Sequence, residues 1–161
     1  MICKGIKAAV VSGAACVAVM SMSAEAETGF GKQAGKAGRW TVYVDKDAMT
    51  DNVECTALFD DRAQVQLTDT SLAISLRGRG GVQGYRTRLD DGPASELKLP
   101  SEVEKDVGAI FLDGATYQTI RAARRLRLEA LTVLGSLVQE DIDLSANSEI
   151  NRFFRANGCH I

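Results

Sequence analysis

The chain has 161 residues, of which 45% are hydrophobic and 25% charged, with 15 Gly and only 2 Pro. This composition excludes collagen-like, low-complexity and multi-pass membrane proteins. The formal net charge of -2 argues against a nucleic-acid binder, which would carry a basic excess. The single histidine, His160, is close to the chain end and offers little for a Ser/His/Asp triad or a histidine metal site.

Residues 1–26 have the pattern of a secretory signal peptide. Lys4 and Lys7 provide the positive start, the apolar stretch 8–22 follows, and Ala24 and Ala26 are small residues at the two positions that a signal peptidase reads, so cleavage would leave Glu27 as the new N-terminus. This apolar stretch is shorter than a spanning helix, which needs about 20 residues. We therefore predict a periplasmic or secreted protein with no transmembrane helix after cleavage.

The cysteines support the same compartment. Cys3 and Cys16 lie in the signal peptide, and a lipoprotein acylated at Cys16 is the alternative to cleavage after residue 26. Cys55 and Cys159 remain, and two cysteines in an exported protein usually pair. A redox pair is disfavoured, because the chain has no Cys-x-x-Cys spacing. The sequence predicts a Cys55–Cys159 disulfide.

The first half of the remaining chain predicts a lead-in and two strands. Residues 27–38, rich in Gly, Lys and Ala, are predicted to be a flexible lead-in to a single domain over 39–161. β-branched and aromatic residues predict strands at 40–44 and 53–59, which pair as a hairpin. A short strand or a turn of helix follows at 65–67.

A second hairpin is predicted from alternation. Apolar residues at every second position predict a strand at 71–76. The Gly-rich segment 77–81 permits the positive φ angles of a turn, and 82–89 is predicted to return beside the first strand.

The C-terminal half predicts alternating helices and strands. Ser101 and Glu104 have capping-box spacing, which is typical of a helix start. The later elements are a strand at 109–112, a helix at 116–125, strands at 126–133 and 137–144, and a last helix after Ser145 with Ile150, Phe153 and Phe154 on one face.

These elements together predict the fold class. Many short strands with few helices favour an α+β fold, a mainly antiparallel twisted sheet with two or three short helices on one face. A β-sandwich with added helices is the alternative.

Carboxylates provide the only candidate for hydrolysis. A hydrolase that works with two carboxylates needs one of them in a pocket that raises its pKa. Asp90, Asp91 and Asp141 are the candidates. Each also has a structural explanation, since turns and helix starts favour aspartate. We predict no catalytic residues.

The acidic loop 45–51 does not predict a metal site. Asp45, Asp47 and Asp51 suggest calcium binding, but Met49 and Thr50 stand where the EF-hand pattern requires another ligand and a glycine. We predict neither a metal nor a cofactor.

Arginine is the most strongly patterned polar residue. If the arginines meet on one face, they form a positive patch for phosphate, anionic lipid or a carboxylate-rich partner. Otherwise they pair with Asp90, Asp91, Glu129 and Asp143 across neighbouring strands. The two clusters are Arg77, Arg79, Arg86 and Arg88, and Arg121, Arg124, Arg125 and Arg127.

Several short segments carry a resemblance to a known family. Residues 38–42 (GRWTV), 54–57 (ECTA), 109–114 (AIFLDG), 126–144 and the closing 158–159 (GC) resemble the invasion-associated locus B family of small secreted bacterial proteins. The chain has fewer cysteines than that family usually shows. The resemblance implies a secreted or envelope accessory protein linked to host entry, with no catalytic residues to carry over.

The sequence thus predicts an exported, non-enzymatic accessory or interaction protein. The expected partner is a protein or an anionic component of the envelope or host, and not a nucleic acid. A carboxylate-dependent envelope hydrolase is the alternative.

Overall fold

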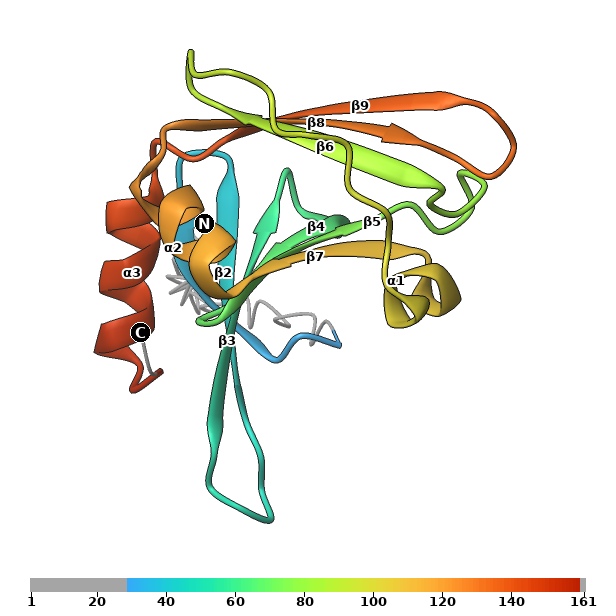
Figure 1. The fold of residues 1–161 in the computed structure, drawn as a ribbon. Coiled ribbons are helices and arrows are strands. Elements are labelled where there is room, and N and C mark those ends of the chain that lie inside the picture. Colours follow the sequence, from blue (N-terminus) through green and yellow to red (C-terminus); the bar gives the residue numbers. More distant parts are fainter. Residues whose placement is uncertain (1–28, 160–161) are drawn as a thin grey trace, which may run out of the picture.

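A computed structural model describes residues 29–159, in which two open antiparallel sheets and three short helices form an α+β domain (Figure 1). The larger sheet has the strand order β1(Lys32–Ala37), β2(Trp40–Lys46), β3(Val53–Phe59), β4(Arg62–Leu67), β5(Ser71–Ser75), β7(Ala109–Asp113). The smaller sheet has the order β6(Gly84–Leu89), β8(Arg125–Leu131), β9(Leu137–Asp143). The helices are α1(Glu102–Val107), α2(Gly114–Ala122) and α3(Asn147–Ala156).

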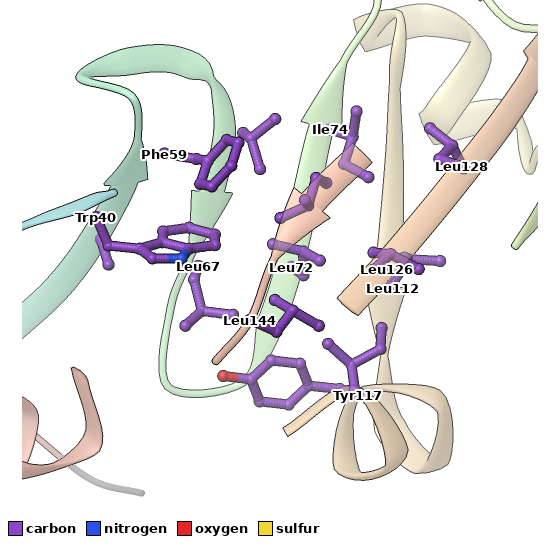
Figure 2. Packing of buried hydrophobic residues seen from close by; sticks show 14 of the residues in the cluster. Trp40, Phe59, Leu67, Leu72, Ile74, Leu112, Tyr117, Leu126, Leu128 and Leu144 are labelled. Carbon is purple, nitrogen blue, oxygen red and sulfur yellow. The ribbon is translucent and has the colours of Figure 1, made fainter. Parts of the chain in front are cut away.

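The core lies between the two sheets. One buried cluster contains Leu72 and Ile74 of β5 together with Leu126 and Leu128 of β8. Figure 2 also shows in this cluster the aromatic rings of Trp40 and Phe59, which belong to the larger sheet. The indole Nε1 of Trp40 donates a hydrogen bond to the carbonyl oxygen of Asp143 at 2.7 Å, which ties β2 to the end of β9. The small sheet therefore has one face against the core.

The α+β class, the single domain and the antiparallel pairing are confirmed, but the strands form two sheets rather than one. The predicted hairpin of 71–76 with 82–89 is wrong. β5 pairs with β4 and β7, whereas β6 pairs with β8, so the segment 77–81 crosses from one sheet to the other. Alternation shows which side of a strand is buried and does not show which strand lies beside it.

The flexible lead-in predicted for 27–38 is also corrected. Lys32–Ala37 forms β1, which pairs with β2 and contacts α3. A Cβ added to Gly35 would lie 2.4 Å from Cε1 of Phe153, so the glycine makes room for that ring. At Gly35 the glycine thus reflects the close packing of β1 against Phe153.

Other local predictions are confirmed. β2 and β3 form the predicted hairpin. In the capping box, Ser101 Oγ accepts from Glu104 N at 3.2 Å, and Glu104 Oε2 accepts from Ser101 N at 2.7 Å. The disulfide joins Cys55 on β3 to Cys159, with 6.0 Å between their Cα atoms, and so fastens the segment after α3 to the larger sheet.

Some predictions concern residues outside 29–159. The signal peptide, Cys16 and His160 all lie there. Of the helices in the described part of the chain, none is long and apolar enough to cross a membrane.

Candidate functional site: an arginine pocket on the small sheet

The small sheet has an outer face that points away from the larger sheet (Figure 1). Alternation along β8 sends Leu126, Leu128 and Ala130 into the core, so Arg127 and Glu129 point outward. By the same alternation, the side chains on β6 and β9 that are register partners of Arg127 and Glu129 also point outward. The charged faces of three strands therefore meet on one surface.

A shallow pocket of about 400 Å³ lies on this face, and we call it the arginine pocket. Thr87, Leu128 and Glu140 are register partners across the three strands; they line the pocket as the middle row, although their side chains alternate toward the inner face of the sheet. The row on one side is Arg88, Arg127 and Asp141, and the row on the other side is Arg86, Glu129 and Gln139. Ala94 completes the lining.

The acidic groups of the pocket are already paired. Glu129 forms an ion pair with Arg86, and Glu140 forms one with Arg79. Asp141 accepts a hydrogen bond from Nε of Arg125 at 2.7 Å. The side-chain hydrogen bonds from Arg125 hold the pKa of Asp141 below its usual range.

The two central arginines lack such a carboxylate. Arg88 donates from Nε to the carbonyl of Gly92 at 2.8 Å and from Nη2 to that of Asp91 at 3.4 Å. Arg127 Nη2 lies 3.8 Å from Oδ1 of Asp91, beyond hydrogen-bond distance. The Nε of Arg127 is buried and finds no acceptor within the described part of the chain. Two adjacent guanidinium groups thus have no carboxylate at hydrogen-bond distance within residues 29–159.

The turn after β6 fixes the edge of the pocket. Asp90 has φ 49°, and its Oδ1 accepts hydrogen bonds from the backbone N of Arg124 and of Arg125, both at 2.9 Å. The backbone N of Asp90 donates to the carbonyl of Arg125 at 2.9 Å. This turn joins the ends of β6 and β8 and presents the carbonyl groups that hold Arg88.

The predicted arginine clusters meet only in part. Arg86, Arg88, Arg125 and Arg127 share the outer face of the small sheet. Arg77 and Arg79 lie on the 77–81 segment, near the other end of β6. Arg121 stands over the ring of Tyr117, with its Cζ 5.8 Å from the ring centroid, and Arg124 is exposed beside α2.

The predicted pairing of these arginines also holds in part. Arg86 with Glu129 and Arg127 with Asp91 form two of the expected cross-strand contacts. Asp143 forms no hydrogen bond with an arginine of the described segment and instead accepts from the backbone N of Ser145 at 2.8 Å. Internal pairing therefore accounts for Arg86 and in part for Arg127, whereas Arg88 is held by backbone carbonyl groups.

The three carboxylates that are candidates for hydrolysis are either hydrogen-bonded or exposed to solvent. Asp90 holds two backbone N–H groups, the side chain of Asp91 is fully exposed, and the pKa of Asp141 is lowered. A general acid needs a raised pKa, and the pKa of Asp141 is shifted in the opposite direction.

The acidic loop 45–51 forms a local turn. Asp47 Oδ1 accepts from the backbone N of Thr50 at 2.9 Å and of Met49 at 2.7 Å, which lowers the pKa of Asp47. Asp51 pairs with Lys46 at 2.7 Å. Within residues 29–159, no group of three or more His, Cys, Asp or Glu side chains is placed to hold a metal ion.

Sequence reasoning missed the contribution of β9 and of the 90–92 turn to the pocket. The signal was the spacing of two residues between Arg86 and Arg88, between Arg127 and Glu129, and between Gln139 and Asp141, which puts each pair on one strand face. It did not show that these three strands are neighbours.

Comparison with family models, with curated proteins and with solved structures finds no match for this chain.

Proposed function

We propose that this protein is an exported, non-enzymatic binding protein whose arginine pocket holds an anionic group of a partner. The partner is a protein or an envelope or host component that presents carboxylates or phosphates. Planar guanidinium groups bind both kinds of oxyanion in a bidentate way. The resemblance to the invasion-associated locus B family, and with it a role at the envelope or in host entry, is part of this proposal.

One observation carries the proposal. Arg88 and Arg127 are register partners on adjacent strands, and within residues 29–159 neither has a hydrogen-bonded carboxylate, although the acids around them pair with Arg86, Arg125 and Arg79. Like charges directly opposite one another destabilise a sheet. An anion bound between the two guanidinium groups would remove that repulsion.

The compartment is proposed from the disulfide and the predicted signal peptide together. Disulfides persist in oxidising compartments, so Cys55–Cys159 supports a periplasmic or secreted protein. The test is the intact mass of protein recovered from an envelope fraction. We expect a mass that begins at Glu27, with two thiols alkylated only after reduction. A mass that begins at an acylated Cys16 would make it a lipoprotein, and an uncleaved chain with free thiols would contradict export.

Binding is tested with a fluorescein-labelled oligoglutamate peptide and with inorganic phosphate as competitor. Fluorescence anisotropy of the labelled peptide should rise on addition of the protein and fall when phosphate competes. The double variant Arg88→Gln/Arg127→Gln should bind at least about tenfold more weakly, because two charge-assisted hydrogen-bond donors are lost.

The matched control is Arg77→Gln/Arg155→Gln, which removes the same charge from two exposed arginines outside the pocket. We expect it to bind the peptide nearly as well as the unmodified protein, apart from the weak effect of net charge. Equal loss in both double variants would show diffuse attraction, and no binding by the unmodified protein would also overturn the proposal.

A further inference from the structure

The β8–β9 hairpin carries a group of exposed aliphatic side chains at its tip. Leu131, Val133, Leu134 and Leu137 are all exposed, Val133 by 68% and Leu134 by 79%. Figure 1 shows this tip at the end of the small sheet, next to the segment that joins β5 to β6. Single exposed apolar residues are ordinary, but a contiguous group marks an interaction site. We call these four residues the apolar tip.

The exposure is fixed by a hydrogen-bonded turn. Gly135 N donates to the carbonyl of Thr132 at 2.9 Å, and Ser136 N donates to Thr132 Oγ1 at 3.0 Å. Val133 N donates to the carbonyl of Gly80 at 3.1 Å, so the turn is also fastened to the 77–81 segment. Thr132 is fully buried. The apolar side chains are therefore held outward by an ordered backbone.

Glycine lets the neighbouring segment approach the tip closely. Gly80 has φ 98°, and a Cβ added to it would lie 2.9 Å from Cγ of Leu134. The same segment carries Arg77, which is exposed and has no ion pair within the described part of the chain, and Arg79, which pairs with Glu140. Within residues 29–159, Arg77 is thus the cation of this segment that no ion pair neutralises.

We propose that the apolar tip inserts into the surface of an anionic phospholipid bilayer, with Arg77 against the lipid phosphates. The aliphatic side chains would lie at the boundary of headgroups and acyl chains, as in other interfacial segments. Arginines near the surface of an anionic leaflet add attraction at the level of the headgroups. This inference does not depend on the arginine pocket, because the apolar tip contributes no residue to its lining.

The shape of the surface favours a bilayer over a protein partner. The tip is a projecting turn of four aliphatic residues, and a bilayer accommodates a projection without a matching groove. Protein–protein interfaces are instead enriched in aromatic residues, which the apolar tip lacks.

The test is flotation of the full-length protein with lipid vesicles. Vesicles of phosphatidylglycerol and phosphatidylethanolamine should carry the protein, and vesicles of phosphatidylcholine alone should carry less. Val133→Ser/Leu134→Ser should lower binding more than about tenfold, because two apolar side chains no longer leave water. Arg77→Gln should lower binding to the anionic vesicles and leave binding to the neutral ones unchanged.

Met49 provides the matched control. It is 93% exposed in the loop between β2 and β3, at the tip of another hairpin. Met49→Ser should float like the unmodified protein, and all variants should keep the unmodified midpoint of thermal unfolding. The Arg88→Gln/Arg127→Gln variant should also float, which separates this inference from the proposed function.

Three results would overturn the inference. The first is an unmodified protein that stays free of anionic vesicles. The second is equal loss of flotation in the Met49→Ser variant. The third is an unmodified protein that does not bind vesicles and forms a dimer in size-exclusion chromatography, while the Val133→Ser/Leu134→Ser variant is a monomer. That result would make the apolar tip a contact between two copies of the chain.

Discussion

Arg88 on β6 and Arg127 on β8 are register partners, so two positive side chains stand opposite each other on the outer face of the small sheet. Two residues earlier on β6, Arg86 stands opposite Glu129 and pairs with it. The same pair of strands thus contains one complementary pair and one repulsive pair. The repulsive pair lines the arginine pocket, where an anionic ligand would relieve it.

This contrast predicts opposite effects of two similar substitutions. Arg127→Gln should raise the free energy of unfolding by a few tenths to about 1 kcal/mol, because it removes a cross-strand repulsion. Arg86→Gln should lower it by a similar amount, because it breaks the pair with Glu129. Urea denaturation in a buffer without multivalent anions measures both. A destabilised Arg127→Gln variant would mean that this arginine supports the sheet instead.

Gly35 should not tolerate a side chain. A Cβ there would lie 2.4 Å from the ring of Phe153, so Gly35→Ala would force β1 and α3 apart. We expect a loss of about 1–3 kcal/mol, the usual cost of overpacking. The combination of Gly35→Ala with Phe153→Leu should recover part of that loss in thermal unfolding. Unchanged stability of Gly35→Ala alone would contradict the packing of α3 on β1.

The disulfide should contribute strongly to stability. Cys55 and Cys159 are 104 residues apart, and the chain-entropy relation gives about 4–5 kcal/mol for a loop of that length. Cys55→Ser/Cys159→Ser should therefore unfold at a much lower urea concentration, with the last helix losing amide protection first. Unfolding at the same urea concentration with and without the disulfide would contradict this role.

Two buried tyrosines predict a loss of stability at high pH. Burial raises the pKa of Tyr117 and that of Tyr85 to about 12, compared with 10.0 for an unburied tyrosine. The unfolded chain therefore releases these protons between pH 10 and 12 while the folded protein keeps them. Stability should be unaffected by these groups below pH 10 and fall as pH rises from 10 to 12.

The matched variant for this prediction is Tyr117→Phe. It loses the hydrogen bond to the carbonyl of Thr68, which lowers stability at all pH values by about 1 kcal/mol. It should also make the decline between pH 10 and 12 shallower, since only Tyr85 still contributes. The slope in urea denaturation is the readout, and an unchanged slope would show that Tyr117 does not titrate in this range.

Local patterns predicted most of the elements but little of their arrangement. The alternation in Leu126 to Leu131 and the capping box at Ser101 identified β8 and α1, because both depend on residues close in sequence. The pairing of β6 with β8 depends on strands separated by α1, β7 and α2. No local pattern contains that information.

The same distinction applies to the candidate site. The eight arginines were identifiable by type and spacing, but the pocket depends on which of them have carboxylate neighbours on other strands. Glu140 pairs with Arg79 across 61 residues of sequence, and Asp141 pairs with Arg125 across β8 and β9. Within residues 29–159, Arg88 and Arg127 therefore form no hydrogen bond with a carboxylate, although Arg127 lies opposite Asp141, and only the tertiary structure shows this.

An anion site on the small sheet can be tested by NMR of the arginine side-chain N–H groups during titration with oligoglutamate peptide. We expect the signals of Arg88 and Arg127 to shift and saturate together, while those of Arg77 and Arg155 change little. Their shifts should also disappear when phosphate displaces the peptide. Uniform small shifts of all exposed arginines, or none at Arg88 and Arg127, would contradict a specific anion site on the small sheet.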